Sequence, residues 1–401
     1  MQPFEGIRVQ DFTHVLSGPF AAYQLSGMGA DVIKIEPPGT PDMMRDQDAD
    51  PVLSDQGLGT GFTSQNAGKS SLVLDLPTSE GLVVAKRLAE DADVRIENYR
   101  AGKLEALGLG CEAVAAIRPD IIYCSMTGFG QTGPKRRHPA YDPVIKAYSG
   151  LMAANGTADH HPTRVGPPLI DCGTGAQGSF AIASALFQRC RTGKSQRIDV
   201  AMADAALMIM SMPVMATQAL GRTPPPFGSV TPGQAGYSCY ETAEGLIFLG
   251  AATVQQYVNL LRALGEEALA DERAGMTRQE IADLAEQDMG RLTEILAART
   301  ADEWEAIINE RGVPAAQARR MDEALAEPQT ATRGVVAASE IESDGGPLSL
   351  PVAAFGCHHD GPALAGLVPR HGEHSRQVLE EAGLSASEIV DLIAGGAVLQ
   401  S

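Results

Sequence analysis

The chain has 401 residues, of which 44% are hydrophobic, and this length favours two domains, or one large domain with an insertion, over a single core. Its formal net charge of −19, from 50 acidic and 31 basic residues, argues against nucleic acid or an anionic membrane surface as the main partner. Any phosphate-bearing ligand must therefore be bound by a local basic cluster.

The six cysteines and eight histidines lack the spacing of a metal site. No two cysteines are separated by two residues, and the adjacent histidine pairs at 160–161 and 358–359 do not place two rings on one helix face. The N-terminus has no signal-like apolar stretch, and no later segment is long and apolar enough to cross a bilayer. We expect a soluble cytoplasmic protein with reduced cysteines, no metal and no permanently bound cofactor.

The first 200 residues alternate β-rich runs with helical patterns, which is typical of βαβ units around a mostly parallel sheet. The expected strands share β-branched and aliphatic residues and lie at 7–12, 31–35, 71–74, 94–96, 121–124 and 197–200. The expected helices lie at 20–27, 79–92, 174–191 and 203–220, and packing accounts for the methionines of the last. The pattern predicts an open, Rossmann-like α/β domain.

Prolines and glycines between Gly221 and Gly236 interrupt regular structure and predict a domain boundary. A hairpin is expected at 237–242 and 246–249, followed by charged helices. Further on, the chain predicts strands near Val335 and Leu350 and closing helices over 374–394. These elements divide the chain into a large α/β domain, a smaller α+β domain and a C-terminal segment that returns to the first domain, with bounds 1–220, 221–325 and 326–401.

Asp171 is the strongest candidate for a chemical role. It follows the apolar pair Leu169 and Ile170 and precedes a glycine-spaced helix start, where small residues leave room for a ligand to approach its oxygens. An aspartate with an ordinary pKa of about 3.9 is ionised at neutral pH and can attack an activated acyl carbon without a separate base. The alternative is a helix N-cap, which the local sequence alone favours by about two to one.

Several ordered motifs resemble the class III coenzyme A transferases, the group of formyl-CoA transferase and carnitine CoA-transferase that also contains 2-methylacyl-CoA racemases. These motifs lie at 11–19 (DFTHVLSGP), 29–36 (GADVIKIE), 66–71, 97–102 (ENYRAG), 141–142, around Asp171, at 193–197 and at 372–375. The resemblance covers nearly the whole first half of the chain in order, and it is weaker between Gly221 and about Leu350.

The resemblance implies an open α/β fold built from both chain ends, with the smaller domain inserted, and an interlocked homodimer. It places Asp171 where the family has its catalytic aspartate. The implied reaction transfers coenzyme A from an acyl-CoA donor to a small carboxylic acid through an aspartyl anhydride and an aspartyl-CoA thioester. We expected the unpaired backbone N–H groups after Asp171 to stabilise the oxyanions of these steps.

The resemblance also implies which residues contact acyl-CoA. The turn after the first strand, His14, Val15 and Leu16, is assigned to the pantetheine arm and the site entrance. Asn98, Tyr99 and Arg100 follow a strand, so from their position we expect them to line the CoA path. Arg100, Lys103 and Lys69 are the candidate partners of the CoA phosphates. Tyr141 and Asp142 are the remaining candidate substrate contacts, where Asp142 either orients Tyr141 or a backbone donor, or serves as a structural cap. From the residues alone, a single histidine is more often structural and isolated basic residues are more often surface charges. The cluster 135–138 is a further phosphate candidate or a solvated loop.

Three alternatives remain open at this stage. The racemases have a histidine immediately before the acid of the motif at Tyr141 and Asp142, and tyrosine is a poor base at neutral pH, so transferase chemistry is favoured. The second alternative is a nicotinamide-dependent oxidoreductase, but the turn after the first strand lacks the three glycines of a nicotinamide-binding fingerprint. The third alternative, a noncatalytic acyl-CoA-binding protein, would bind CoA without a covalent adduct.

The segment 232–236 has two interpretations. We expect a domain linker in the first place, and a lid over the site in the second.

Overall fold

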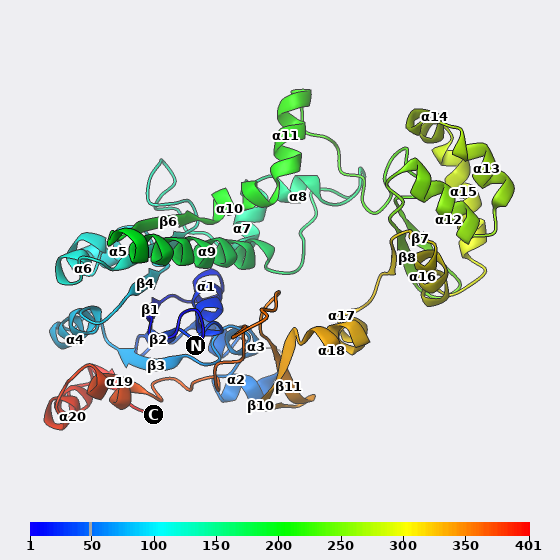
Figure 1. The fold of residues 1–401 in the computed structure, drawn as a ribbon. Coiled ribbons are helices and arrows are strands. Elements are labelled where there is room, and N and C mark those ends of the chain that lie inside the picture. The colour runs from blue at the N-terminus through cyan, green and yellow to red at the C-terminus, as the bar shows by residue number, and fades with distance from the viewer. Residues whose placement is uncertain (48–49) are drawn as a thin grey trace. The chain divides into compact units, whose positions relative to one another are not determined.

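The computed structural model describes residues 1–47 and 50–401, and the described chain divides into two compact units. The larger unit comprises Met1–Leu151, Arg164–Gly221 and Pro328–Ser401, and the smaller comprises Met152–Thr163 and Arg222–Glu327. Both chain termini belong to the larger unit (Figure 1). The segment 152–163, which we expected in the first domain, instead joins the smaller unit, where Thr157 packs beside Gly228.

Within the described residues, the larger unit is built on a seven-stranded sheet of order β12-β3-β2-β1-β4-β5-β6. Its strands are β1 (Arg8–Phe12), β2 (Asp31–Glu36), β3 (Ser70–Leu74), β4 (Val94–Glu97), β5 (Ile122–Thr127), β6 (Arg197–Ala201) and β12 (Val398–Leu399). All neighbours pair in parallel except β12, which runs antiparallel to β3. The predicted open, mostly parallel sheet is confirmed, and its last strand comes from the C-terminal segment.

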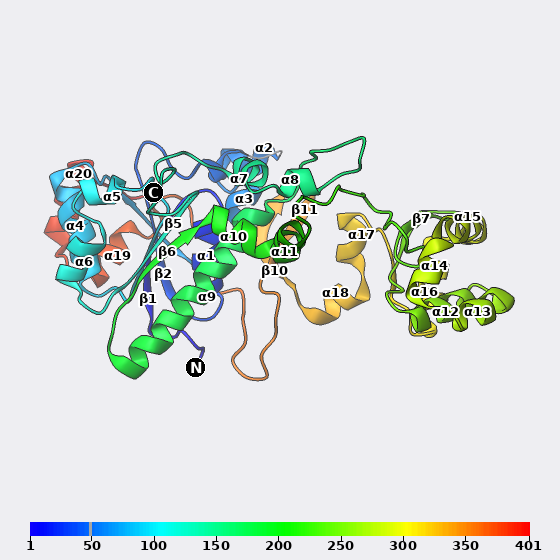
Figure 2. The same cartoon turned by 90° about the horizontal axis from the view of Figure 1, so that it is seen from above.

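Helices cover both faces of this sheet (Figures 1 and 2). On one face, α1 (Ser17–Ser26) and α9 (Leu169–Thr192) share a core with Val9 of β1. On the other, α4 (Ser79–Ala89), α19 (Ser375–Glu381) and α20 (Ala386–Ala394) share a core with Phe12. Because successive side chains of a strand point to opposite faces, one strand supplies both cores. Double coverage explains why successive residues of the central strands are buried.

The remaining elements of the larger unit are short. They are η1 (Met43–Arg45), α2 (Pro51–Asp55), α3 (Thr60–Thr63), α5 (Lys103–Ala106), α6 (Cys111–Ile117), α7 (Asp142–Tyr148), α10 (Met202–Ile209), α11 (Ser211–Leu220), α18 (Pro328–Arg333), β10 (Val336–Ser343) and β11 (Gly346–Pro351). The hairpin of β10 and β11 corresponds to the strands expected near Val335 and Leu350.

Two of the expected helices differ from the prediction by more than three residues or by a break. The helix expected at 174–191 begins five residues earlier, at Leu169. The single helix expected at 203–220 is two helices, α10 and α11, bent by 74° around Met210. Pro213 explains the break, because it lacks the N–H that a continuous helix would donate to the carbonyl of Ile209. Within the described part of the chain no single helix has the length and hydropathy of a membrane span, although α10 and α11 reach both when taken together.

The smaller unit combines a three-stranded antiparallel sheet with helices, counted over its described residues. Its elements are β7 (Cys239–Glu241), β8 (Leu246–Leu249), β9 (Ala315–Gln317), α12 (Val254–Ala263), α13 (Glu267–Ala274), α14 (Arg278–Asp283), α15 (Ala285–Leu296), α16 (Ala301–Glu310) and α17 (Met321–Ala326), while α8 (Leu151–Ala154) crosses the boundary. The predicted hairpin is β7 and β8, and β9 was not predicted. Trp304 lies in the core and donates its Nε1–H to Leu296 O at 2.9 Å.

The segment 232–236 is not a free linker. Ala235 is buried, and its carbonyl accepts a hydrogen bond from the Tyr240 hydroxyl at 2.6 Å. A side chain at position 236 would collide with Tyr257, so Gly236 allows the loop to lie against the helices of the smaller unit. The loop therefore belongs to the fold of that unit.

Candidate active site

The site lies where β1 and β4 end side by side at the carboxyl edge of the sheet. The strand order reverses between these two strands, which is where open α/β sheets bind ligands. A cavity of about 430 Å³ opens at this edge. It is lined by His14, Asn98, Tyr99, Arg100, Ala101, Lys103, Thr127, Gly128, Arg136, His138, Pro139, Ala140 and Tyr141. Six of the residues that we expected to contact CoA are therefore brought to one cavity.

Two turns are joined on the floor of this cavity. Asn98 accepts the backbone N–H of His14 at 3.0 Å and donates its own amide to the His14 carbonyl at 2.7 Å. The His14 and Tyr99 rings lie 5.4 Å apart, and burial lowers the pKa of His14, so the imidazole is held neutral. Glu97 accepts the N–H of Tyr99 at 2.9 Å, and burial raises the pKa of Glu97 to about 7.

The rim of the cavity is basic. Arg100 and Lys103 from the turn after β4 face the same space as Arg136 and His138, while the described lining contains no acid. The local charge of the cavity is therefore opposite in sign to the net charge of the chain, which is −19. Guanidinium and ammonium groups gathered in this way suit phosphate oxygens. Two members of the 135–138 cluster therefore belong to the cavity, whereas Lys135 lies over the rings of Phe129 and Tyr148.

Lys69 is placed away from the cavity, contrary to our expectation. It is 3% exposed, and its ammonium contacts Asp11 Oδ2 at 2.8 Å, Asn66 Oδ1 at 2.9 Å and Pro19 O at 3.0 Å. With these three acceptors the group is satisfied inside the protein, so the geometry argues against a phosphate contact. Its role is to join β1, α1 and the start of β3.

Val15 and Leu16 are half-buried and do not line the cavity. Val15 has a φ of 69°, and Leu16 is the N-cap residue of α1, whose carbonyl accepts the N–H of Phe20 at 2.8 Å. Of the predicted turn, only His14 reaches the lining. The other two residues shape the turn that presents it.

Asp171 sits in the first turn of α9 and is 6% exposed. The helix begins at Leu169 with Pro168 as its N-cap, so Asp171 is not the cap residue. Its carboxylate accepts no hydrogen bond from residues 1–47 or 50–401. Burial, and secondarily the neighbouring Asp142 carboxylate, raises the pKa of Asp171 to about 7. Our assumption of an ordinary aspartate was therefore wrong, because it ignored burial.

The early start of α9 also changes the expected oxyanion donors. Residues after Asp171, including Gly173 and Gly175, lie inside the helix, where their N–H groups bond to carbonyls four residues earlier. The small residues serve packing instead. A side chain at Gly175 would meet Ser17 O and Phe20, and one at Gly173 would meet Ile209. They allow α9 to lie directly against α1 and α10.

Asp142 fixes the start of α9. Its Oδ2 accepts the N–H of Ile170 at 2.8 Å and the N–H of Asp171 at 3.4 Å. Its Oδ1 pairs with Lys146 Nζ at 2.5 Å, and this ammonium also donates to Val165 O at 2.9 Å. The Asp142 side chain, which comes from α7, thus accepts hydrogen bonds from backbone N–H groups in the first turn of α9 that have no partner within the helix. It follows Tyr141 directly, and so links the cavity lining to the backbone of Asp171.

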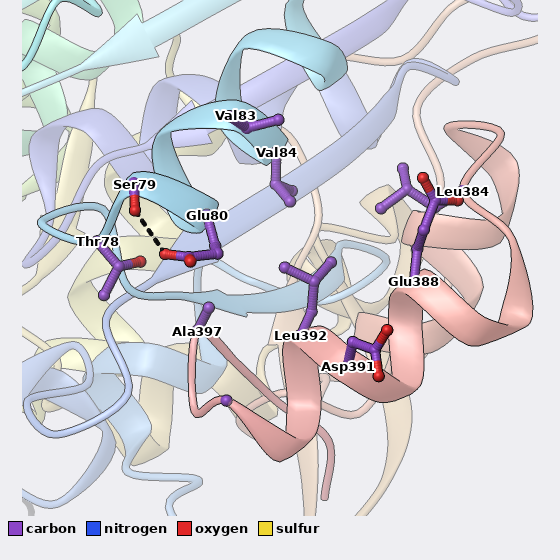
Figure 3. Close-up of a pocket in the computed structure, with 11 residues that line it drawn as sticks. Thr78, Ser79, Glu80, Val83, Val84, Leu384, Glu388, Asp391, Leu392 and Ala397 are labelled. Carbon is purple, nitrogen blue, oxygen red and sulfur yellow. Dashed lines mark hydrogen bonds between the residues drawn. The ribbon is translucent and has the colours of Figure 1, made fainter.

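A second cavity, of about 560 Å³, lies between α4 and α20 (Figure 3). Its floor is apolar, with Val84 and Leu392, and its carboxylates come from Glu80, Glu388 and Asp391. The described lining contains no basic side chain. Its carboxylates would repel the phosphates of an anionic substrate, so the smaller basic cavity is the candidate site.

The fold and this site define an α/β protein with a basic cavity lined by Tyr141, and the next residue, Asp142, accepts the backbone N–H of the buried Asp171. The sequence matches CoA-transferase family III over residues 4–375, and the chain belongs to that family. It is therefore an enzyme of the class III CoA-transferase kind, as the resemblance implied.

Individual relatives agree with this assignment. Succinyl-CoA:glutarate CoA-transferase from Mus musculus is 34% identical over 390 residues, which span 95% of this chain and 86% of the relative. Acetyl-CoA:oxalate CoA-transferase from Acetobacter aceti is 36% identical over 335 residues, 83% of this chain and 85% of the relative. The crystal structure of a CAIB/BAIF family protein from Brucella suis superposes with a TM-score of 0.82 at 31% identity and covers 95% of this chain and 99% of that one.

Sequence reasoning missed three buried groups that shape the site. Lys146, Glu97 and Asp42 are all at most 5% exposed, and each bonds to the backbone of a turn or helix start that borders the site. Asp42 and Lys146 lie outside the motifs that carry the resemblance, and Glu97 opens the motif 97–102 without having been given a role there. A signal was available for Lys146, which follows Asp142 by one helical turn.

Proposed function

We propose that this enzyme transfers coenzyme A from an acyl-CoA donor to a carboxylic acid acceptor by covalent catalysis on Asp171. The observation that carries the proposal is the buried Asp171 carboxylate, which accepts no hydrogen bond from the described residues. Its backbone N–H is bound by Asp142, and Asp142 directly follows Tyr141 in the lining of the basic, acid-free cavity. The names of the relatives favour short dicarboxylic acids as acceptors and succinyl-CoA or acetyl-CoA as donors.

In this mechanism the Asp171 carboxylate attacks the thioester carbonyl of the donor, the carbon–sulfur bond breaks, and CoA thiolate leaves behind a mixed anhydride. The thiolate then attacks the aspartyl carbonyl and releases the donor as a free carboxylate, which leaves an aspartyl-CoA thioester. The acceptor carboxylate attacks this thioester to form a second anhydride. Attack of the thiolate on the acceptor carbonyl releases the new acyl-CoA and regenerates Asp171.

The environment of Asp171 supports this role. Burial raises its pKa to about 7, and a more basic carboxylate is a stronger nucleophile while remaining substantially ionised near neutral pH. Arg100, Lys103 and Arg136 would bind the phosphates, and the His14 and Tyr99 turns would contact the pantetheine arm. A CoA molecule held at its phosphates and along its pantetheine arm would keep its thioester next to the Asp171 carboxylate. The attack would then occur between positioned groups and would not depend on a bimolecular encounter.

The test is intact-protein mass spectrometry after incubation with succinyl-CoA, with and without glutarate. We expect a CoA adduct on the wild type, conversion of Asp171 to a hydroxamate by hydroxylamine, and formation of glutaryl-CoA when glutarate is present. Asp171→Asn should show none of these. Asp204→Asn, on the exposed surface of α10, is the matched control and should react as the wild type does.

Other outcomes would contradict the proposal. CoA binding without any adduct across a panel of oxalate, succinate, mesaconate, malate, carnitine and aromatic acids would indicate a noncatalytic binder. Epimerisation of a 2-methylacyl-CoA, with no transfer to any acid, would indicate a racemase. Tyr141 stands at the position of the racemase base and is exposed, which makes this second result unexpected.

We also propose that the enzyme is a homodimer. The support is a set of exposed apolar side chains on α9, α10 and α11 of the larger unit, which we name together the α9–α11 face: Phe180, Phe187, Met208, Met212 and Met215. Apolar faces of this kind mark protein interfaces.

A further inference from the structure

The turn after β1 has an unusual backbone. Val15 has a φ of 69°, and among the described residues other than glycine only Asp360 shares a positive φ. This region is rarely occupied by a β-branched residue, because its side chain crowds the backbone. The conformation must therefore be imposed by the surroundings, and it is found one residue from His14, which lines the cavity.

Asp42 supplies the imposing contacts. Its two carboxylate oxygens accept the N–H of Val15 at 3.1 and 3.2 Å. Lys34 Nζ contacts Asp42 Oδ2 at 3.1 Å and donates to the carbonyl of Thr13 at 2.9 Å. The ion pair thus hydrogen-bonds to the backbone on both sides of His14, at Thr13 and at Val15. Asn98 hydrogen-bonds to the backbone of His14 itself.

The Lys34–Asp42 ion pair is buried. The side chains of Lys34 and Asp42 are at most 1% exposed. The N–H of Asp42 is bound by Glu36 at 3.0 Å, and Glu36 pairs with Arg45 at 2.7 Å. Polar groups so completely buried are costly unless each is satisfied, and here they are satisfied partly by the turn.

We propose that Asp42 is a positioning residue of the active site, which holds Val15 in the left-handed conformation and so presents His14 to the acyl-CoA. The assignment rests on the proposed function, because it concerns how the substrate is positioned. Asp42 acts through the turn and does not line the cavity. Its loss should therefore affect substrate binding more than the chemical step.

The first variant is Asp42→Asn, with the KM for acyl-CoA measured separately from kcat. We expect kcat/KM to fall by up to about a hundredfold, the loss that a displacement of about 1 Å at a site can cause, with the rise in KM larger than the change in kcat. The decisive variant adds Val15→Gly. Glycine adopts positive φ without strain, so it should lower the KM of the Asp42→Asn enzyme toward that of the Val15→Gly single variant.

A purely structural role for Asp42 makes a different prediction. Loss of folded enzyme would lower the apparent kcat, leave KM unchanged and gain nothing from Val15→Gly. Asp288→Asn is the matched control, because Asp288 is equally buried and paired with Arg273 at 2.9 Å in the smaller unit. It should lower thermal stability without raising KM, and Val15→Gly should not compensate for it.

If Asp42→Asn fails to fold, the double variant Asp42→Ala and Lys34→Met removes both charges and leaves no unpaired ion. It should show the same rise in KM and the same rescue by Val15→Gly. Additive effects of the changes at 42 and 15 in an active enzyme would overturn the inference alone. A wild type that transfers no CoA would instead overturn the proposed function.

Discussion

Asp171 is held at its position by its backbone, while its carboxylate receives no compensating contact from the described residues. Asp142 takes the Asp171 N–H and the charge of Lys146, which leaves the Asp171 carboxylate beside a like charge and away from water. Such an arrangement raises the energy of the ionised acid. Catalysis by attack of that acid on a thioester would relieve this unfavourable charge, because an anhydride is neutral.

Replacing Asp171 by asparagine should stabilise the protein at neutral and alkaline pH. The folded pKa of about 7 exceeds the ordinary value of 3.8, so the folded state favours the protonated acid and this contribution is lost as pH rises through 7. Asparagine resembles the protonated acid at every pH. Unfolding in denaturant should therefore show a gain on the order of a few kcal/mol at pH 8 and little difference near pH 4. Equal stability at both pH values would contradict the buried-charge account.

The same ionisation should govern activity. Because only the ionised carboxylate attacks, kcat/KM for the donor acyl-CoA should rise with pH and level off above an apparent pKa near 7. The measurement is a pH–rate profile from pH 5 to 9 with the stability of the enzyme checked at each point. Glu97, whose pKa is also raised to about 7 by burial, borders the site, so Glu97→Gln tests which acid sets the profile. A profile that persists in Glu97→Gln assigns it to Asp171.

At the scale of elements, the close packing of α1 and α9 is what places Asp171 beside the carboxyl edge of the sheet. A side chain at Gly175 would approach Ser17 O to 2.6 Å and Phe20 to 2.8 Å. Gly175→Ala should therefore push the helices apart and destabilise the protein by about 1–3 kcal/mol. Gly290→Ala, in α15 with no atom within 4 Å of its side-chain position, is the control and should be neutral or stabilising by up to about 1 kcal/mol. Thermal unfolding of the two variants makes the comparison, and equal effects would contradict it.

The strands were predictable from the sequence, whereas the beginning of α9 was not. Strand β2, for example, is a short run rich in β-branched residues, with Val32, Ile33 and Ile35, and this pattern is local. The first turn of α9 contains no favoured cap residue, since Pro168 precedes it, and its N–H groups are bound by Asp142, 28 residues away from Ile170. A contact between distant residues leaves no mark in a local pattern.

The same distinction separates the candidate residues that line the cavity from those that do not. Asn98, Tyr99 and Arg100 directly follow a strand, so their place at the carboxyl edge follows from topology. Lys69 stands in an equally recognisable motif, yet its side chain turns inward to Asp11, 58 residues earlier in the chain. Whether a basic residue near an edge faces the ligand or the core depends on such partners, which the sequence alone does not identify.

At the scale of the whole molecule, the proposed homodimer rests on the exposure of the α9–α11 face. Phe180 is 70% exposed and Met212 is 79% exposed, although a monomeric enzyme would gain by replacing such residues with polar ones. Two of the helices that carry the face, α9 and α10, also pack around Asp171 through Gly173 and Ile209. A second copy that covers this face would therefore also stiffen the helix that carries the nucleophile.

We expect the wild type to sediment as a dimer of the 42.1 kDa chain at micromolar concentration. Glutamate at both Met212 and Met215 should shift it to the monomer, because burying two charges at an interface costs more than the apolar contacts gain. Val83→Glu is the control, since Val83 is 67% exposed on α4, outside the α9–α11 face, and this variant should remain dimeric. A monomeric wild type would contradict the proposal. If the partner stiffens α9, the monomeric variant should also lose CoA transfer in proportion to its dissociation, and activity should return as protein concentration rises.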